Sequence, residues 1–214
     1  MKGINQYPFR GGNNHPPEPK PIIHKENTMS RIHIVDPKTA TGDARNLLDA
    51  VQSQLGVTPN FIRVLANSPK ALEGFLGLYG AMGGISLNKA TQERIALGTA
   101  EGNACQYCVS AHTAIGRHAG LSNEEMLLNR QGTSADAKAA AIVGFARALN
   151  DNLGDVTTAE FDAAHAAGLN DAEIVEVISV VALNIFTNLI GKATHVDIDF
   201  PKVALLGAVE RKAA

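Results

Sequence analysis

Helix-start signals recur along the chain after Asp36, and they constrain its fold more than any other feature. Three stretches place Ser, Thr or Asn three residues before Glu, which is the spacing of a capping box. These pairs are Ser122 with Glu125, Thr157 with Glu160, and Asn170 with Glu173. Two further stretches place proline directly after Thr58 and Ser68, which is typical of an N-cap followed by proline at the first helical position.

Apolar side chains follow these signals at helical rather than strand spacing. One stripe holds Leu47, Leu48, Val51 and Leu55, and Gly56 ends it. No alternating polar and apolar run is long enough for a sheet. Aromatic residues make up only 5% of the chain, which suits closely packed helices with small side chains. We therefore predict one all-α domain over residues 36–214, with about seven to nine helices.

The N-terminal region differs from the rest of the chain. It contains a stretch rich in Pro, Gly and Asn without helical periodicity, so we expect residues 1–35 to form an irregular arm or leader. It has no apolar signal segment, and no apolar run in the chain approaches the ~20 residues that span a bilayer. The formal net charge of −2 gives no electrostatic reason to expect a nucleic-acid or membrane partner. We expect a cytoplasmic protein.

Both cysteines of the chain lie in one short stretch, "CQYCVSAH". Cys105, Cys108 and His112 have the spacing i, i+3 and i+7, so they share one stripe of a helix. Gly102 interrupts the preceding helical pattern, because glycine is a poor helix former and a common helix end. If the chain reverses there, a central helical hairpin brings Glu93 opposite His112. We predict that two thiols, an imidazole and a carboxylate meet on this seam.

Such a group can activate a thiol. The imidazole of His112 takes the thiol proton, the carboxylate of Glu93 orients the imidazole, and the thiolate attacks a peroxide. The resulting sulfenic acid forms a disulfide with the second thiol. Helix-dipole arguments favour the lower pKa at Cys105, which is nearer the helix start. Zinc binding by the four groups and inert packing of the thiols remain alternatives. A haem attachment requires His where Val109 stands.

The pattern of Glu, eleven residues, Cys-x-x-Cys, three residues and His resembles the signature of the AhpD-like alkylhydroperoxidases, in the carboxymuconolactone decarboxylase superfamily. The similarity runs from about Asp36 to Pro201, and "LNIFTNLIGKATHVDIDFP" is similar to the peroxidase-related branch. The resemblance implies an all-helical fold and homo-oligomers built as trimers or hexamers. It also implies thiol-dependent reduction of hydroperoxides without haem, metal or another cofactor. An external thiol, a dihydrolipoamide-type reductant or a redox protein would reset the disulfide.

The resemblance also assigns roles to individual residues. It implies that Cys108 is the peroxidatic cysteine and Cys105 the resolving one, with His112 and Glu93 as the proton relay. Tyr107 stands where the best-studied members carry an additional His, and we expect it to pack with its hydroxyl at the rim of the site. Two other functions remain open: a lyase of the decarboxylase type and a non-peroxidatic thiol-disulfide module.

Overall fold

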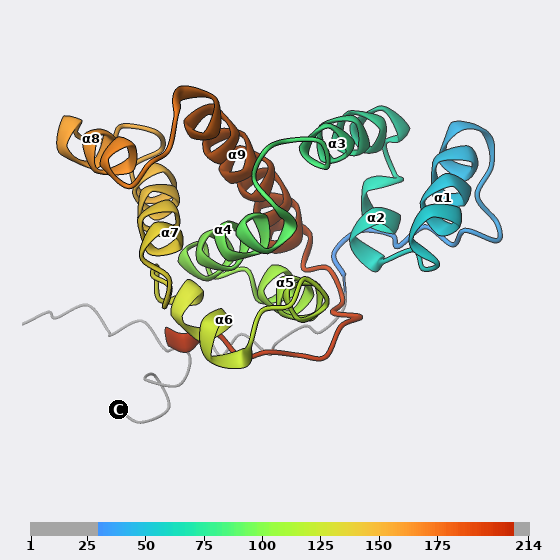
Figure 1. The fold of residues 1–214 in the computed structure, drawn as a ribbon. Helices are drawn as coiled ribbons and strands as arrows, with labels where there is room; N and C mark the ends of the chain where they lie inside the picture. Colours follow the sequence, from blue (N-terminus) through green and yellow to red (C-terminus); the bar gives the residue numbers. More distant parts are fainter. Residues whose placement is uncertain (1–29, 208–214) are drawn as a thin grey trace, which may run out of the picture.

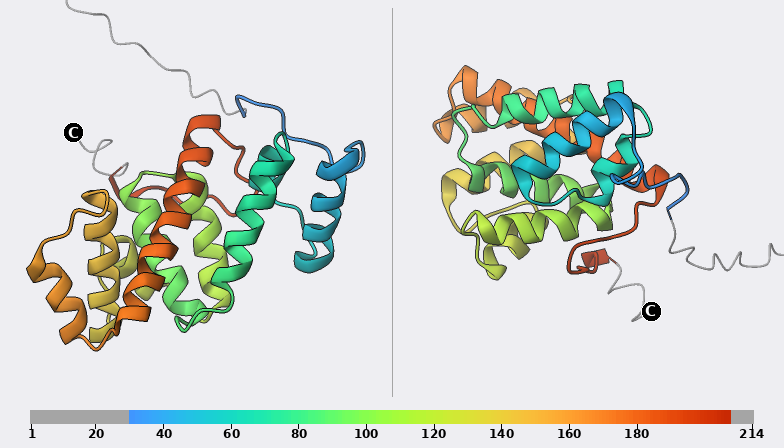
Figure 2. Two further views of the ribbon diagram at one scale, coloured as in Figure 1. Left: turned by 90° about the horizontal axis from the view of Figure 1, so that it is seen from above. Right: turned by 90° about the vertical axis from the view of Figure 1, so that its right-hand side faces the viewer.

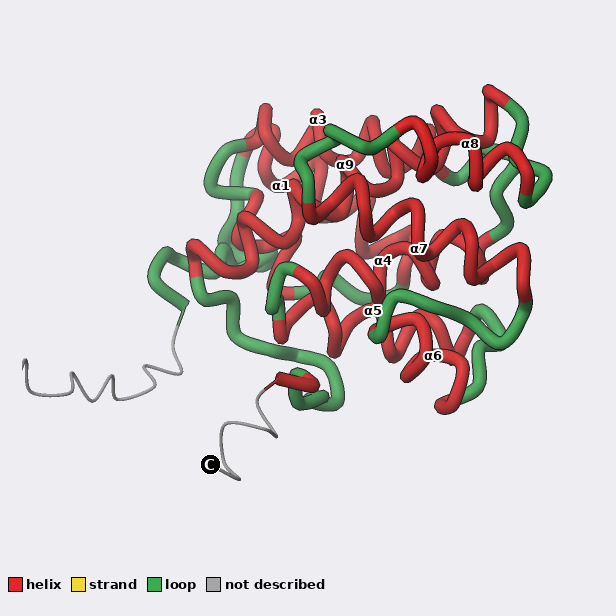
Figure 3. The backbone as a smooth tube through the Cα atoms, turned by 90° about the vertical axis from the view of Figure 1, so that its left-hand side faces the viewer, coloured by secondary structure: helices red, strands yellow, loops and turns green. Residues whose placement is uncertain are grey.

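The computed structural model describes residues 30–207, and within this range it contains nine α-helices and no strand (Figures 1 and 3). The helices are α1 (Gly42–Leu55), α2 (Asn60–Leu65), α3 (Pro69–Met82), α4 (Lys89–Gly102), α5 (Gln106–His118), α6 (Asn123–Arg130), α7 (Ala137–Asp151), α8 (Thr158–Ala166) and α9 (Asp171–Thr194). The predicted all-α fold is confirmed. Most of the arm predicted over residues 1–35 lies outside the described residues, and residues 30–35 contain no helix.

Helix α4 lies at the centre of the molecule and contacts α5, α6, α7 and α9. The longest helix, α9, runs beside it, and α3 packs along another side of α9 (Figure 2). One buried apolar cluster joins α1, α2, α3 and α5 to Ala100 of α4 and the second half of α9. Another joins α7 and α8 to α4 and the first half of α9. Residues on α4 and α9 are therefore shared between the two halves of the core.

The helix-start predictions are confirmed at three sites. Ser68 caps α3 by accepting from the Ala71 N–H, and Pro69 is the first helical residue. Capping boxes form at the starts of α8 and α9, where Thr157 pairs with Glu160 and Asn170 with Glu173. In each box the polar side chains satisfy N–H groups that have no partner within the helix.

Two helix-start predictions are wrong in detail. Thr58 does not cap α2, because Pro59 occupies the N-cap position and the Asn60 N–H donates to the Asp199 carboxylate at 2.7 Å. At the start of α6, Ser122 accepts from the Glu125 N–H, but the Glu125 carboxylate does not return the bond. At α2 a tertiary partner replaces the local cap, whereas at α6 the Ser122 cap remains and only the return bond from Glu125 is lost.

The Glu125 carboxylate instead joins three parts of the fold. It accepts from Arg94 at 2.7 Å, from Ser134 at 2.6 Å and from Asn129 at 2.9 Å. Desolvation alone would raise the pKa of Glu125, but these donors lower it to about 2. The carboxylate thus ties α6 and the loop after it to α4.

The expectation that no apolar run is long enough to span a membrane is wrong for α9. This helix of 24 residues meets that criterion by length and composition alone. However, 44% of its most apolar stretch is buried inside the fold, where α9 contacts α3, α4, α5 and α7. Packing on several sides at once explains why an apolar helix of this length occurs here.

Candidate active site

The predicted helical hairpin is present. Helix α4 ends at Gly102, the chain reverses through Ala104 at a φ of 51°, and α5 begins after Cys105 as its N-cap. A side chain at Gly102 would lie 3.2 Å from the Arg147 guanidinium, so glycine permits the close contact with α7 at this turn. Asn103 secures the turn by donating to Asn150 and Asn188 at 2.8 and 2.9 Å.

This hairpin brings Glu93 of α4 against His112 of α5. His112 Nδ1 lies 2.7 Å from Glu93 Oε2, and Glu93 is only 2% exposed. The second carboxylate oxygen, Oε1, lies 2.9 Å from Lys89 Nζ. Burial alone would raise the pKa of Glu93, but the imidazole and the ammonium group together hold it below its ordinary value. A charged carboxylate favours a proton on Nδ1 of His112, which leaves Nε2 to act as a base.

Cys105 and Cys108 form a disulfide at the start of α5, with their Cα atoms 5.3 Å apart. Both residues are buried, and Cys108, unlike Cys105, lines the cavity between α2, α3, α4, α5 and α9. Cys105 Sγ accepts a hydrogen bond from the Cys108 N–H at 3.4 Å, in the manner of an N-cap side chain. The two sulfurs therefore differ: Cys108 faces the cavity, whereas Cys105 lies behind it.

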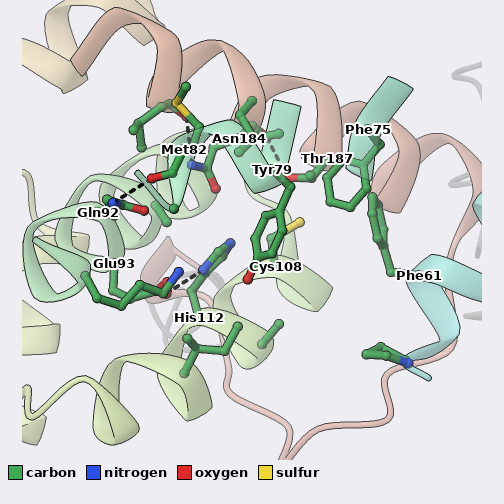
Figure 4. A pocket seen from close by; sticks show the side chains of 18 of the residues that line it. Phe61, Phe75, Tyr79, Met82, Gln92, Glu93, Cys108, His112, Asn184 and Thr187 are labelled. Carbon is green, nitrogen blue, oxygen red and sulfur yellow. Dashed lines mark hydrogen bonds and ion pairs between the residues drawn. The ribbon is translucent and has the colours of Figure 1, made fainter. Parts of the chain in front are cut away.

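The cavity has a volume of about 460 Å³ and is enclosed mainly by α2, α3, α4, α5 and α9 (Figure 4). His112 and Glu93 line it together with Cys108. Most of the remaining wall is apolar, and its aromatic members are Phe61, Phe75, Tyr79, Tyr107 and Phe200. A cavity of this size admits a small organic molecule beside the sulfur and the imidazole.

Tyr107 does not join the imidazole and carboxylate. Its hydroxyl donates to the Asp199 carboxylate at 2.9 Å and accepts from the Phe61 N–H at 3.2 Å. Burial and the nearby carboxylate raise its pKa, so the phenol stays protonated at neutral pH. Although Tyr107 contributes to the cavity wall, it is 6% exposed, and its hydroxyl links α5 to α2 and to the segment after α9.

Tyr107→Phe should destabilise the fold by about 1–3 kcal/mol, because the Phe61 N–H and the Asp199 carboxylate lose a buried partner. Chemical denaturation of both proteins measures this difference. Tyr79→Phe is a suitable control, since Tyr79 is 40% exposed. Equal stability of Tyr107→Phe and the wild type would contradict the linking role.

Gly191 of α9 lies directly against the two sulfurs. A Cβ at this position would approach Cys105 Sγ to 3.1 Å and Cys108 Sγ to 3.6 Å. The first distance is shorter than ordinary van der Waals contact, so α9 can pack against the thiol pair here only because residue 191 lacks a side chain.

Gly191→Ala should therefore lower the free energy of unfolding by about 1–3 kcal/mol through overpacking. Denaturation curves of the oxidised proteins measure the loss. Gly144→Ala is the control, because a Cβ there meets no atom within 4 Å. If Gly191→Ala is as stable as the Gly144→Ala protein, the contact does not constrain α9.

Two residues near the site, Lys89 and Gly191, were not predicted from the sequence. Lys89 precedes Glu93 by four residues, a spacing that predicts an ion pair on a helix. Gly191 interrupts an otherwise regular apolar helix, a pattern that indicates a close approach of another segment.

The four groups of the zinc alternative do not come together as a ligand set. Within residues 30–207, no three His, Cys, Asp or Glu side chains are arranged to hold a metal ion.

Comparisons with known proteins agree with this arrangement. The model of the carboxymuconolactone decarboxylase family matches residues 69–151. A search of curated proteins finds no match. A peroxidase-related protein with an alkylhydroperoxidase AhpD core, from Ralstonia eutropha JMP134, has a TM-score of 0.68 at 25% identity, covering 78% of this chain and 90% of its own.

Two further solved structures share the fold. A peroxidase-related protein from Silicibacter sp. TM1040 has a TM-score of 0.68 at 23% identity, covering 82% of this chain and 92% of its own. The debrominase Bmp8, in complex with 2,3,4-tribromopyrrole, has a TM-score of 0.64 at 19% identity, covering 87% of this chain and 100% of its own. The structural similarity thus covers a larger part of the chain than residues 69–151, which match the family model.

Proposed function

We propose that this chain, which belongs to the AhpD-like and carboxymuconolactone decarboxylase superfamily, is a thiol-dependent peroxidase. Its family and its structural neighbours support an enzyme of this general type. The observation that carries the specific activity is that Cys108 lines an organic-sized cavity with His112, whose imidazole is held by a buried carboxylate.

The cycle begins with both cysteines reduced. His112 takes the proton of Cys108, and the thiolate attacks the terminal oxygen of a hydroperoxide. The S–O bond forms as the O–O bond breaks, and the electron pair leaves on the alkoxide oxygen, which takes the proton back from His112. The thiol of Cys105 then attacks the sulfenic sulfur, water leaves, and the disulfide forms.

An external thiol or a dihydrolipoamide-type dithiol resets the pair by thiol–disulfide exchange. We place this cycle in the cytoplasm, where the thiol pool is reducing. No metal or other cofactor takes part in the proposed steps.

The test is turnover of reduced protein with cumene hydroperoxide. Loss of two thiols per chain, restored by dihydrolipoamide over many cycles, supports the peroxidase. Oxidation that occurs without repeated turnover would instead favour a thiol-disulfide module. Decarboxylation of a muconolactone-type acid that persists with both cysteines changed to Ser would favour the lyase.

A second candidate reaction is the reductive removal of bromine from an aromatic ring, favoured by the aromatic wall beside Cys108. The Cys108 thiolate takes bromine from carbon, and the electron pair of the C–Br bond stays on the ring carbon, which takes a proton from His112. Cys105 then displaces bromide as the disulfide forms. Bromide release from a bromopyrrole, with loss of two thiols, is the measurement.

We further propose that the protein is a homo-oligomer, a trimer or hexamer. Support comes from α9, where Val175, Ile178, Phe186 and Leu189 are exposed on one apolar stripe. Exposed apolar stripes of this kind mark association surfaces. Light scattering on the purified protein measures the subunit number, and a monomer at micromolar concentration would contradict the proposal.

A further inference from the structure

The cavity has two chemically different ends. Figure 4 shows the amides of Gln92 and Asn184 to the left of Cys108, and the rings of Phe61 and Phe75 to its right. Proton transfer at the proposed site requires neither amide. Their presence in an otherwise apolar wall therefore needs another explanation.

Hydrogen bonds decide which atom of each amide faces the cavity. Asn184 is 5% exposed, and its Nδ2 donates to the Val180 carbonyl at 2.8 Å. Gln92 Nε2 donates to the carbonyls of Met82 at 3.1 Å and Leu87 at 2.8 Å. Because the NH2 groups are held by backbone carbonyls, the amide oxygens are left for the cavity. Figure 4 shows the oxygen of Asn184 directed away from α9 into this space.

Neither amide oxygen accepts a hydrogen bond from any residue between 30 and 207. Neither oxygen is among the fully buried atoms without a partner, so both remain accessible from the cavity that their residues line. Each can therefore accept a hydrogen bond from a ligand that supplies a donor. The charged groups of the wall are already paired, because Lys89 and His112 both bind Glu93. The cavity therefore offers two acceptors but no unpaired cation for an anionic group.

The spacing along α9 indicates the length of such a ligand. Asn184 and Gly191 are seven residues, or two turns, apart on the same face, which corresponds to about 10 Å along the helix. Gly191 lies against the sulfurs, since a Cβ on this residue would be 3.6 Å from Cys108 Sγ. A ring-sized apolar group therefore fits between the reacting sulfur and the amide end.

We infer that the cavity takes a neutral, largely apolar molecule whose hydroxyl or N–H group, at the end away from its reacting group, donates to Asn184 Oδ1 and Gln92 Oε1. The inference rests on the proposed function only in naming the reacting group as a hydroperoxide. Recognition by the two amides can be measured without turnover.

Three unreactive probes separate the possibilities: para-isopropylphenol carries a donor, para-isopropylanisole lacks it, and para-isopropylbenzoate is anionic. Calorimetry on the oxidised wild-type protein at neutral pH should give a dissociation constant about two- to tenfold lower for the phenol than for the anisole. The benzoate should bind most weakly. Because the anisole carries an additional apolar methyl group, burial alone would favour it, so a preference for the phenol reports the donor.

Asn184→Leu removes one acceptor at similar volume and should bring the ratio of the two constants toward one. Ser179→Ala is the matched control on α9, because Ser179 also bonds a backbone carbonyl but does not line the cavity, and it should keep the wild-type ratio. Equal binding of phenol and anisole by the wild type, or an unchanged ratio in a folded Asn184→Leu protein, would overturn the inference. So would tightest binding of the benzoate. If Asn184→Leu does not fold, the wild-type ranking alone decides. Failure of peroxide turnover would count against the proposed function, not against this result.

Discussion

Cys108→Ser should abolish catalytic hydroperoxide reduction, lowering kcat/KM by about 1,000-fold or more. A serine hydroxyl is not ionised at neutral pH, and His112 would have to activate a much weaker acid. No other thiol can replace it, because the chain has only one further cysteine, Cys105, which does not line the cavity. Consumption of cumene hydroperoxide with excess dihydrolipoamide measures the loss.

Cys105→Ser is the matched control, since it removes the neighbouring sulfur and leaves the one at the cavity. It should reduce about one equivalent of peroxide per chain and then slow, because the sulfenic acid at Cys108 has no partner thiol. Trapping with dimedone and mass spectrometry locates that acid. If Cys105→Ser blocks the first equivalent while Cys108→Ser does not, the two roles are reversed.

The helix dipole alone does not predict which of the two cysteines reacts with peroxide. Cys105 is nearer the start of α5, which predicts that it is the more acidic thiol. The fold adds a second difference, because only Cys108 meets the cavity. Access depends on α2, α3 and α9, which are distant in sequence from the cysteines. The local properties of "CQYCVSAH" therefore do not predict which sulfur a peroxide reaches, and the assignment of Cys108 came only from the family resemblance.

The hairpin, by contrast, was predictable because its causes are local. Gly102 interrupts one helix, and equal spacing on either side of the turn places Glu93 opposite His112. Local patterns failed where a distant group competed for the same atoms. Glu125 leaves its predicted capping box because Arg94 is a stronger, charged partner. The amides of Gln92 and Asn184 carry no sequence signal, since their importance depends on which atom faces the cavity.

Glu93→Gln should lower kcat/KM for hydroperoxide by about 100-fold or more, although the side chain keeps its shape. Glutamine cannot balance the charge on His112 as it takes the proton from Cys108, and its NH2 group would face a donor at either Lys89 or His112. Alkylation of reduced Cys108 by iodoacetamide at neutral pH should slow in parallel, because that rate reports the thiolate.

The same substitution should change how stability depends on pH. The pKa of Glu93 is held below its ordinary value of 4.5, so its charged contacts stabilise the fold above that pH and are lost as the pH falls below it. The free energy of unfolding of the wild type should exceed that of Glu93→Gln by about 2 kcal/mol at neutral pH. This difference should shrink below pH 4.5. Glu101→Gln is the matched control, because Glu101 lies on the same helix as Glu93 but outside the cavity, and it pairs with Arg130 of α6 at 2.7 Å. It should lose stability without slowing the alkylation of Cys108. A folded Glu93→Gln protein with wild-type alkylation and turnover would show that the carboxylate supports the fold alone, and that His112 needs no partner to act as a base.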